Sequence, residues 1–123
     1  MKTILIVDDE YGIVQFLTDL LADQGYRAVT AANGKQALDR IEETKPDLVL
    51  LDFTMPIMDG AATLKALTDN PATRDIPVVM MSSFFEPTVT EACGPYAAFL
   101  RKPFKVQAVV DLVTRLIGKA EAD

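Results

Sequence analysis

The feature that most constrains the fold is a fivefold alternation between short apolar runs and stretches whose apolar residues recur at helical spacing. The apolar runs cover residues 2–7, 26–32, 48–51, 76–81 and 97–101, and the helix-spaced stretches cover 11–24, 35–44, 61–68, 87–93 and 105–117. Repeated strand-then-helix units predict an α/β protein, a single doubly wound parallel sheet with helices on both faces and right-handed connections. The common small arrangement has five strands in the order 2-1-3-4-5.

The run 48–51 is apolar without alternation, which is typical of a strand buried on both faces. It ends at Asp52, and ligands bind at the carboxyl ends of strands in open parallel sheets. Taken alone, Asp52 is equally consistent with the start of a turn. The other strands that border the expected crevice also end in polar side chains, namely Asp8 and Asp9 after the first strand, Ser82 at the fourth and Lys102 at the fifth. We therefore expect these groups to meet at one edge of the sheet.

Composition excludes several classes of function. A length of 123 residues, half of them hydrophobic, predicts one domain with a packed core. No apolar stretch approaches the roughly 20 residues of a membrane span, and residues 1–10 become acidic too early for a signal peptide. A net charge of -6 without a basic cluster argues against binding to nucleic acid. The single cysteine, Cys93, excludes an internal disulfide and fits a cytoplasmic location, and the absence of histidine excludes a Ser-His-Asp triad and most zinc sites.

The clustered carboxylates suggest metal-assisted phosphoryl chemistry. Neighbouring carboxylates repel one another, and Mg²⁺ relieves this where a few carboxylates, waters and a phosphate meet. Asp52 is then a candidate nucleophile toward phosphorus, with Lys102 and the Ser82 hydroxyl available to the transferred group. Each residue also has an ordinary interpretation, because lysines are commonly solvated and serine and aspartate commonly cap or begin elements. Their joint occurrence at consecutive strand ends favours the chemical interpretation.

Four motifs carry a resemblance to a known family. They are Ile4-Leu5-Ile6-Val7-Asp8-Asp9-Glu10, Leu50-Leu51-Asp52 with Met55-Pro56 and Met58-Asp59-Gly60, Pro77-Val78-Val79-Met80-Met81-Ser82, and Lys102-Pro103-Phe104. Together they resemble a bacterial response-regulator receiver domain, which has the flavodoxin-like fold. The resemblance covers essentially the whole chain, with residues 1–119 as the domain and 120–123 as a tail.

The resemblance implies a role for each site residue. Asp52 would accept a phosphoryl group from a phosphohistidine on a histidine kinase or a histidine phosphotransfer protein. The Mg²⁺ ligands would be Asp8, Asp9, Asp52 and the backbone carbonyl of Thr54. The phosphate-contacting and switch residues would be Ser82, Ser83, Lys102 and Phe99. Such a domain would not be an enzyme toward other molecules and would catalyse only its own phosphorylation and slow dephosphorylation. It would signal as a monomer or weak dimer through a downstream protein target, and it would bind neither nucleic acid nor a membrane.

Two departures from the family pattern affect this expectation. Ser83 and Phe84 follow the switch serine, where the family usually has a very small residue and then a variable one. A phenylalanine beside Thr54 is expected to screen an acyl phosphate from water, so Thr54 and Phe84 are predicted to modulate the dephosphorylation rate. The second departure is a shortened fourth helix, since Pro87 and the pair Gly94-Pro95 limit it to about two turns.

Two other functions use similar folds. A HAD-type phosphatase also has an aspartate nucleophile and Mg²⁺, but it needs a second aspartate two residues later, where this chain has Thr54. A flavodoxin-like electron carrier needs a hydroxyl- and glycine-rich phosphate loop after the first strand, where this chain has three acidic residues. Both differences favour the receiver interpretation.

Overall fold

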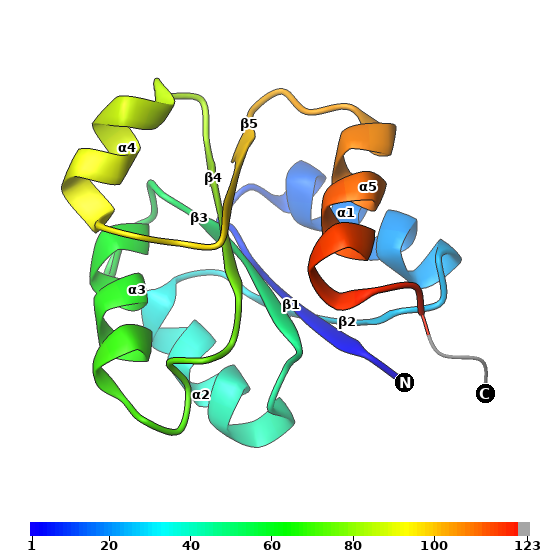
Figure 1. Cartoon of the computed structure of the whole chain (residues 1–123), viewed down its shortest axis with the longest axis horizontal. Coiled ribbons are helices and arrows are strands. Elements are labelled where there is room, and N and C mark those ends of the chain that lie inside the picture. Colours follow the sequence, from blue (N-terminus) through cyan, green and yellow to red (C-terminus); the bar gives the residue numbers. More distant parts are fainter. Residues whose placement is uncertain (121–123) are drawn as a thin grey trace.

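The computed structural model describes residues 1–120, which form one five-stranded parallel sheet between two layers of helices (Figure 1). The strands are β1 (Thr3–Val7), β2 (Arg27–Ala31), β3 (Leu48–Asp52), β4 (Val78–Ser82) and β5 (Ala98–Arg101). The helices are α1 (Tyr11–Asp23), α2 (Gly34–Thr44), α3 (Gly60–Asp69), α4 (Glu86–Cys93) and α5 (Val106–Ile117). The strand order is β2-β1-β3-β4-β5, which confirms the predicted fold class.

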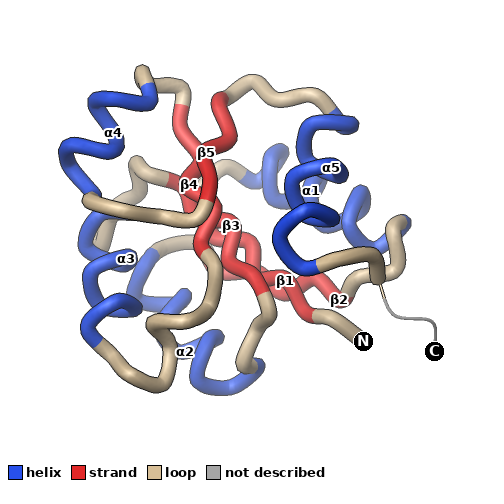
Figure 2. Tube along the Cα trace, viewed as in Figure 1, coloured by secondary structure: helices blue, strands red, loops and turns tan. Residues whose placement is uncertain are grey.

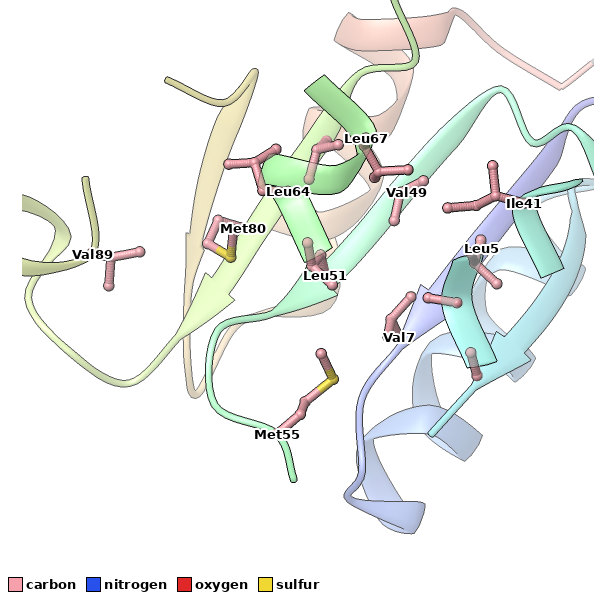
Figure 3. Close-up of a cluster of buried hydrophobic side chains, with 13 residues drawn as sticks. Leu5, Val7, Ile41, Val49, Leu51, Met55, Leu64, Leu67, Met80 and Val89 are labelled. Atoms are coloured by element: carbon pink, nitrogen blue, oxygen red, sulfur yellow. The ribbon is translucent and has the colours of Figure 1, made fainter. Parts of the chain in front are cut away.

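Strand alternation divides the core into two clusters, one on each face of the sheet. Leu5, Val7, Val49, Leu51 and Met80 face the layer formed by α2, α3 and α4 (Figure 3). Their chain neighbours face the opposite layer, formed by α1 and α5, and include Ile4, Ile6, Leu48, Leu50, Val79 and Met81. Figure 2 shows the two helical layers on either side of the strands. Because both faces are covered, β1, β3 and β4 are buried along their whole length, as their uninterrupted apolar sequences predict.

The element boundaries follow from local capping. The Asn33 side chain accepts a hydrogen bond from the Gln36 amide and begins α2, and Asp59 does the same for α3 through the Ala62 amide. Helix α2 ends at Thr44, and the capping residue Lys45 adopts a left-handed conformation before Pro46.

The structure corrects the predicted start of the fourth strand and confirms the short fourth helix. The predicted fourth strand began at Ile76, but this residue lies in a turn, where its amide donates to the Thr73 carbonyl, so β4 begins at Val78. Helix α4 spans 8 residues and is the shortest of the helices within residues 1–120, as expected. Of the predicted tail, residues 121–123 lie outside the described residues.

Candidate functional site at the carboxyl edge of the sheet

Strands β1, β3, β4 and β5 deliver their polar ends to one cleft. The register pairs Val7 of β1 with Leu51 of β3. Asp8 and Asp52 come directly after these two residues, so they lie side by side at the ends of neighbouring strands. The cleft has a volume of about 310 Å³ and is lined by Asp9, Glu10, Asp52, Thr54, Ser82, Ser83, Phe84 and Lys102. A larger hollow of about 700 Å³ lies beside α5, but within residues 1–120 no comparable group of carboxylates converges there. We therefore take the smaller cleft as the candidate site.

Three carboxylates in or beside this cleft can share one cation. Single carboxylate oxygens of Asp8, Asp9 and Asp52 lie within 4.8 Å of one another. Asp8 and Asp52 are buried, whereas Asp9 is exposed. Asp8 is fixed by the Glu10 amide, which donates to its Oδ1 at 2.9 Å. Hard oxygen donors from several carboxylates, open to water on one side through Asp9, are the set that Mg²⁺ prefers.

Lys102 neutralises part of this charge. Its Nζ lies 2.8 Å from Asp8 Oδ2, 3.1 Å from Asp52 Oδ1 and 3.3 Å from Glu10 Oε1. Only 12% of its side chain is exposed. The Lys102 amide donates to the Ser82 carbonyl at 2.9 Å, which ties the chain after β5 to the end of β4. The position of Lys102 at the end of β5 therefore places its ammonium group beside the acidic cluster.

The local field favours a proton on Asp52. Burial, and next the negative charge of Asp8, raise the pKa of Asp52 from 3.8 to about 7, although the Lys102 ammonium opposes this and Asp9 adds to it. Burial lowers the pKa of Lys102, but its hydrogen bond to Asp8 and the charges of Asp52 and Asp8 outweigh that effect and raise it. The carboxylates thus carry more charge than one lysine compensates, and a bound divalent cation would favour the ionised, nucleophilic form of Asp52.

A close backbone contact positions Asp52. The Gly60 amide donates to the Phe53 carbonyl at 3.0 Å. A Cβ atom on Gly60 would lie 2.5 Å from the Asp52 carbonyl oxygen and 2.7 Å from Phe53 Cα, so only glycine lets α3 begin so close to the end of β3. This contact fixes the two ends of the short loop of residues 53–59, and Thr54 of that loop lines the cleft. Within it, Ile57 adopts a φ of 70°, which is uncommon for a β-branched residue.

The β4–α4 loop forms the opposite rim. Ser82 is buried, and its Oγ accepts a hydrogen bond of 3.0 Å from the Phe84 amide. Phe84 is 51% exposed, and its ring packs edge-on against that of Phe53, with ring centroids 6.0 Å apart. Ser83 and Thr54 are exposed and line the cleft as well. The aromatic ring and Thr54 therefore border the same opening.

Phe99 lies outside this group of residues. It is partly buried among the side chains under α2, α3 and α4 and is absent from the lining of the cleft. Its ring centroid lies 6.3 Å from that of Tyr96, whose hydroxyl lies 2.6 Å from Thr90 Oγ1 on α4. Phe99 is thus connected to α4 rather than to the carboxylates.

One residue that contacts the site was missing from the sequence-based set. Glu10 lines the cleft and pairs with Lys102, and the signal that could have identified it is its place directly after Asp8 and Asp9.

Residues 4–114 match the model of the response regulator receiver domain. The chain belongs to this family. Sporulation initiation phosphotransferase F of Bacillus subtilis is 37% identical over 118 residues, with 94% of each chain covered. The chemotaxis protein CheY4 of Vibrio cholerae has a structure that superposes with a TM-score of 0.87 at 29% identity, covering 95% of this chain and 99% of that one. These matches confirm the family resemblance and the fold.

A further receiver-domain structure bears on the acidic cluster. The receiver domain of a sensor histidine kinase from Pseudomonas aeruginosa PAO1 has a TM-score of 0.88 at 26% identity and covers 96% of this chain and 98% of its own. That structure has a magnesium ion coordinated in its active-site cleft.

In the present receiver domain, no helix within residues 1–120 is long and apolar enough to cross a membrane.

Proposed function

We propose that this receiver domain accepts a phosphoryl group on Asp52 in a Mg²⁺-dependent reaction and thereby switches a protein-interaction surface. The observation that carries the proposal is the 3.1 Å contact between Lys102 Nζ and Asp52 Oδ1, next to a cluster of three carboxylates. A nucleophile, a fixed cation and a cation-binding set at one edge are the parts that phosphoryl transfer needs.

In the proposed reaction a carboxylate oxygen of Asp52 attacks phosphorus in line with the leaving group. The new bond joins that oxygen to phosphorus, and the bond from phosphorus to the donor breaks, with its electron pair leaving on the donor. From a phosphohistidine the leaving group is the imidazole nitrogen, and from acetyl phosphate it is acetate. The Lys102 ammonium and the Ser82 hydroxyl donate hydrogen bonds to the phosphoryl oxygens.

The carboxylates of Asp8, Asp9 and Asp52 and the backbone carbonyl of Thr54 are the groups that would hold Mg²⁺. When bound, the ion neutralises charge on the transferring group and on the carboxylates. The donor set fits, because all are hard oxygen atoms and the carboxylate oxygens are already within 4.8 Å of one another. The raised pKa of Asp52 supports this, since burial and the nearby Asp8 charge disfavour the ionised nucleophile by more than the Lys102 ammonium offsets.

The signal is proposed to leave through Phe99 and α4. Ser82 moves toward the phosphoryl group, and Phe99 follows into the space beside β4. Because Phe99 packs against Tyr96, which contacts Thr90, this movement shifts α4. A helix of 8 residues has little stability of its own, so it responds readily to such a change. Ser83 is proposed to contact the phosphate, and Thr54 with Phe84 to limit access of water to it.

The proposed partners follow from this chemistry. A histidine kinase or histidine phosphotransfer protein supplies the phosphoryl group, and a downstream protein target binds the switched surface. The similarity to a sporulation phosphotransferase supports a place in a phosphorelay. We propose that residues 1–119 form the receiver unit and that it works in the cytoplasm.

Phosphorylation with radiolabelled acetyl phosphate and Mg²⁺ tests the proposal. Asp52→Asn is expected to abolish hydroxylamine-sensitive labelling, whereas Asp39→Asn, an equal charge change at an exposed position of α2, is expected to label like the wild type. Normal labelling of the Asp52→Asn variant would refute the assignment of the acceptor. Steady release of inorganic phosphate without an adduct would indicate a phosphatase instead.

A further inference from the structure

Lys102 is the only part of the proposed machinery that is shared among three carboxylates within the described residues. An ammonium group has three N–H donors, and here Asp8, Asp52 and Glu10 all lie within 3.3 Å of it. A phosphoryl group on Asp52 needs at least one of these donors. The phosphoryl oxygens therefore compete with these carboxylates for the Lys102 donors.

The three partners differ in how easily they leave. Asp8 is buried, makes the shortest contact with the lysine and is fixed by a backbone amide. Asp52 is the acceptor itself. Glu10 makes the longest contact, and 61% of its side chain is exposed, so it can turn into water at little cost in desolvation. Of the three partners, Glu10 is the one that can leave Lys102 at the least cost.

Glu10 also adds negative charge at the entrance. Its side chain lines the cleft together with those of Asp9, Ser83 and Phe84. A small phosphodonor arrives as an anion, and like charges within a few ångströms repel even at a solvated rim. The same side chain thus opposes phosphorylation both by holding Lys102 and by repelling the donor.

We propose that Glu10 is a positioning residue that competes with the phosphoryl group for Lys102 and so restrains phosphorylation of Asp52 by donors other than a docked protein. This inference rests on the proposed function of Asp52. A protein partner that covers the rim would displace the Glu10 side chain, whereas acetyl phosphate has no surface with which to do so. Glu10 therefore favours phosphorylation by a protein over phosphorylation by small metabolites.

The test compares Glu10→Gln with the wild type and with Glu42→Gln, which makes the same charge change at an exposed position of α2. With acetyl phosphate and saturating Mg²⁺ at low ionic strength, we expect Glu10→Gln to raise the rate constant of phosphorylation roughly three- to tenfold. This is the size expected when one carboxylate charge is removed a few ångströms from an anionic donor in a solvated site. The gain should shrink near 1 M salt, where the Debye length is about 3 Å. It should also be smaller with phosphoramidate, which carries less negative charge. Glu42→Gln should leave the rate unchanged.

A second variant and a second measurement separate the alternatives. Glu10→Ala removes the contact with Lys102 altogether and should also speed phosphorylation, while the Mg²⁺ affinity measured by calorimetry should change less than the rate. Slower phosphorylation with weaker Mg²⁺ binding would show that Glu10 helps to hold the metal and would overturn the inference. An equal gain in Glu42→Gln, or no gain in either Glu10 variant, would overturn it as well. If the wild type takes no phosphoryl group on Asp52, the proposed function itself has failed.

Discussion

Replacing Asp52 with asparagine should stabilise the metal-free domain at alkaline pH. The pKa of Asp52 rises from 3.8 to about 7 on folding, mainly through burial and the charge of Asp8. A folded-state pKa above the unfolded one gives stability that is complete below pH 3.8 and is lost as the pH rises through 7. Each pKa unit corresponds to about 1.36 kcal/mol, so the difference between 3.8 and about 7 corresponds to about 4 kcal/mol. Of this, roughly 2.5 kcal/mol is lost between pH 5 and pH 8.

Asparagine has nearly the same shape and no charge, so the Asp52→Asn variant escapes this loss. We expect its free energy of unfolding to exceed that of the wild type by up to about 4 kcal/mol at pH 8, with an advantage about 2.5 kcal/mol smaller at pH 5. Urea denaturation in the presence of EDTA measures both values, and Asp39→Asn on the exposed face of α2 controls for net charge. Adding Mg²⁺ should stabilise the wild type and reduce the difference. A variant that is less stable than the wild type at pH 8, or a difference that does not change with pH, would refute this reasoning.

Three further changes test individual contacts. Phe84→Ala should speed spontaneous loss of phosphate severalfold by opening the path of the attacking water. Phe85→Ala should leave the rate unchanged, because Phe85 is exposed and does not line the cleft. Equal rates in the wild type and both variants would exclude a role for the Phe84 ring in blocking water. Gly60→Ala should cost at least about 1–3 kcal/mol in urea denaturation and slow phosphorylation, because its Cβ would lie 2.5 Å from a backbone oxygen; unchanged stability would contradict the close approach. Tyr96→Phe removes the 2.6 Å contact with Thr90 Oγ1 and should speed amide hydrogen exchange across α4, and strong protection that neither this change nor beryllofluoride alters would show that α4 is a stable helix.

Much of the fold could be predicted from the sequence because parallel strands covered on both faces have uninterrupted apolar sequences. The runs that became β1, β3 and β4 were identified to within about two residues, and their polar ends indicated the site. Ile76 was misassigned, because an apolar residue before Pro77 looks like strand while its amide in fact closes a turn. The turn depends on the hydrogen bond from the Ile76 amide to the Thr73 carbonyl, and the spacing of apolar residues does not indicate such a bond.

The details of the site depended on geometry that a sequence does not specify. The pairing of Glu10 with Lys102 spans 92 positions and depends on the path of the chain after β5. The need for glycine at position 60 arises from the approach of α3 to the end of β3. Phe99 pairs with Met80 in the register between β4 and β5 and so faces the same helical layer as Met80, and that register is also a property of the structure. Its distance from the carboxylates follows from that alternation.

The central claim is that Asp52 is the phosphoryl acceptor, and locating the modified residue tests it most directly. After incubation with acetyl phosphate and Mg²⁺, borohydride reduces an aspartyl phosphate to homoserine, which peptide mass spectrometry places at a single position. We predict homoserine at position 52 alone, formed only when Mg²⁺ is present. Homoserine at position 8 or 9, or its absence from a correctly folded protein, would contradict the claim.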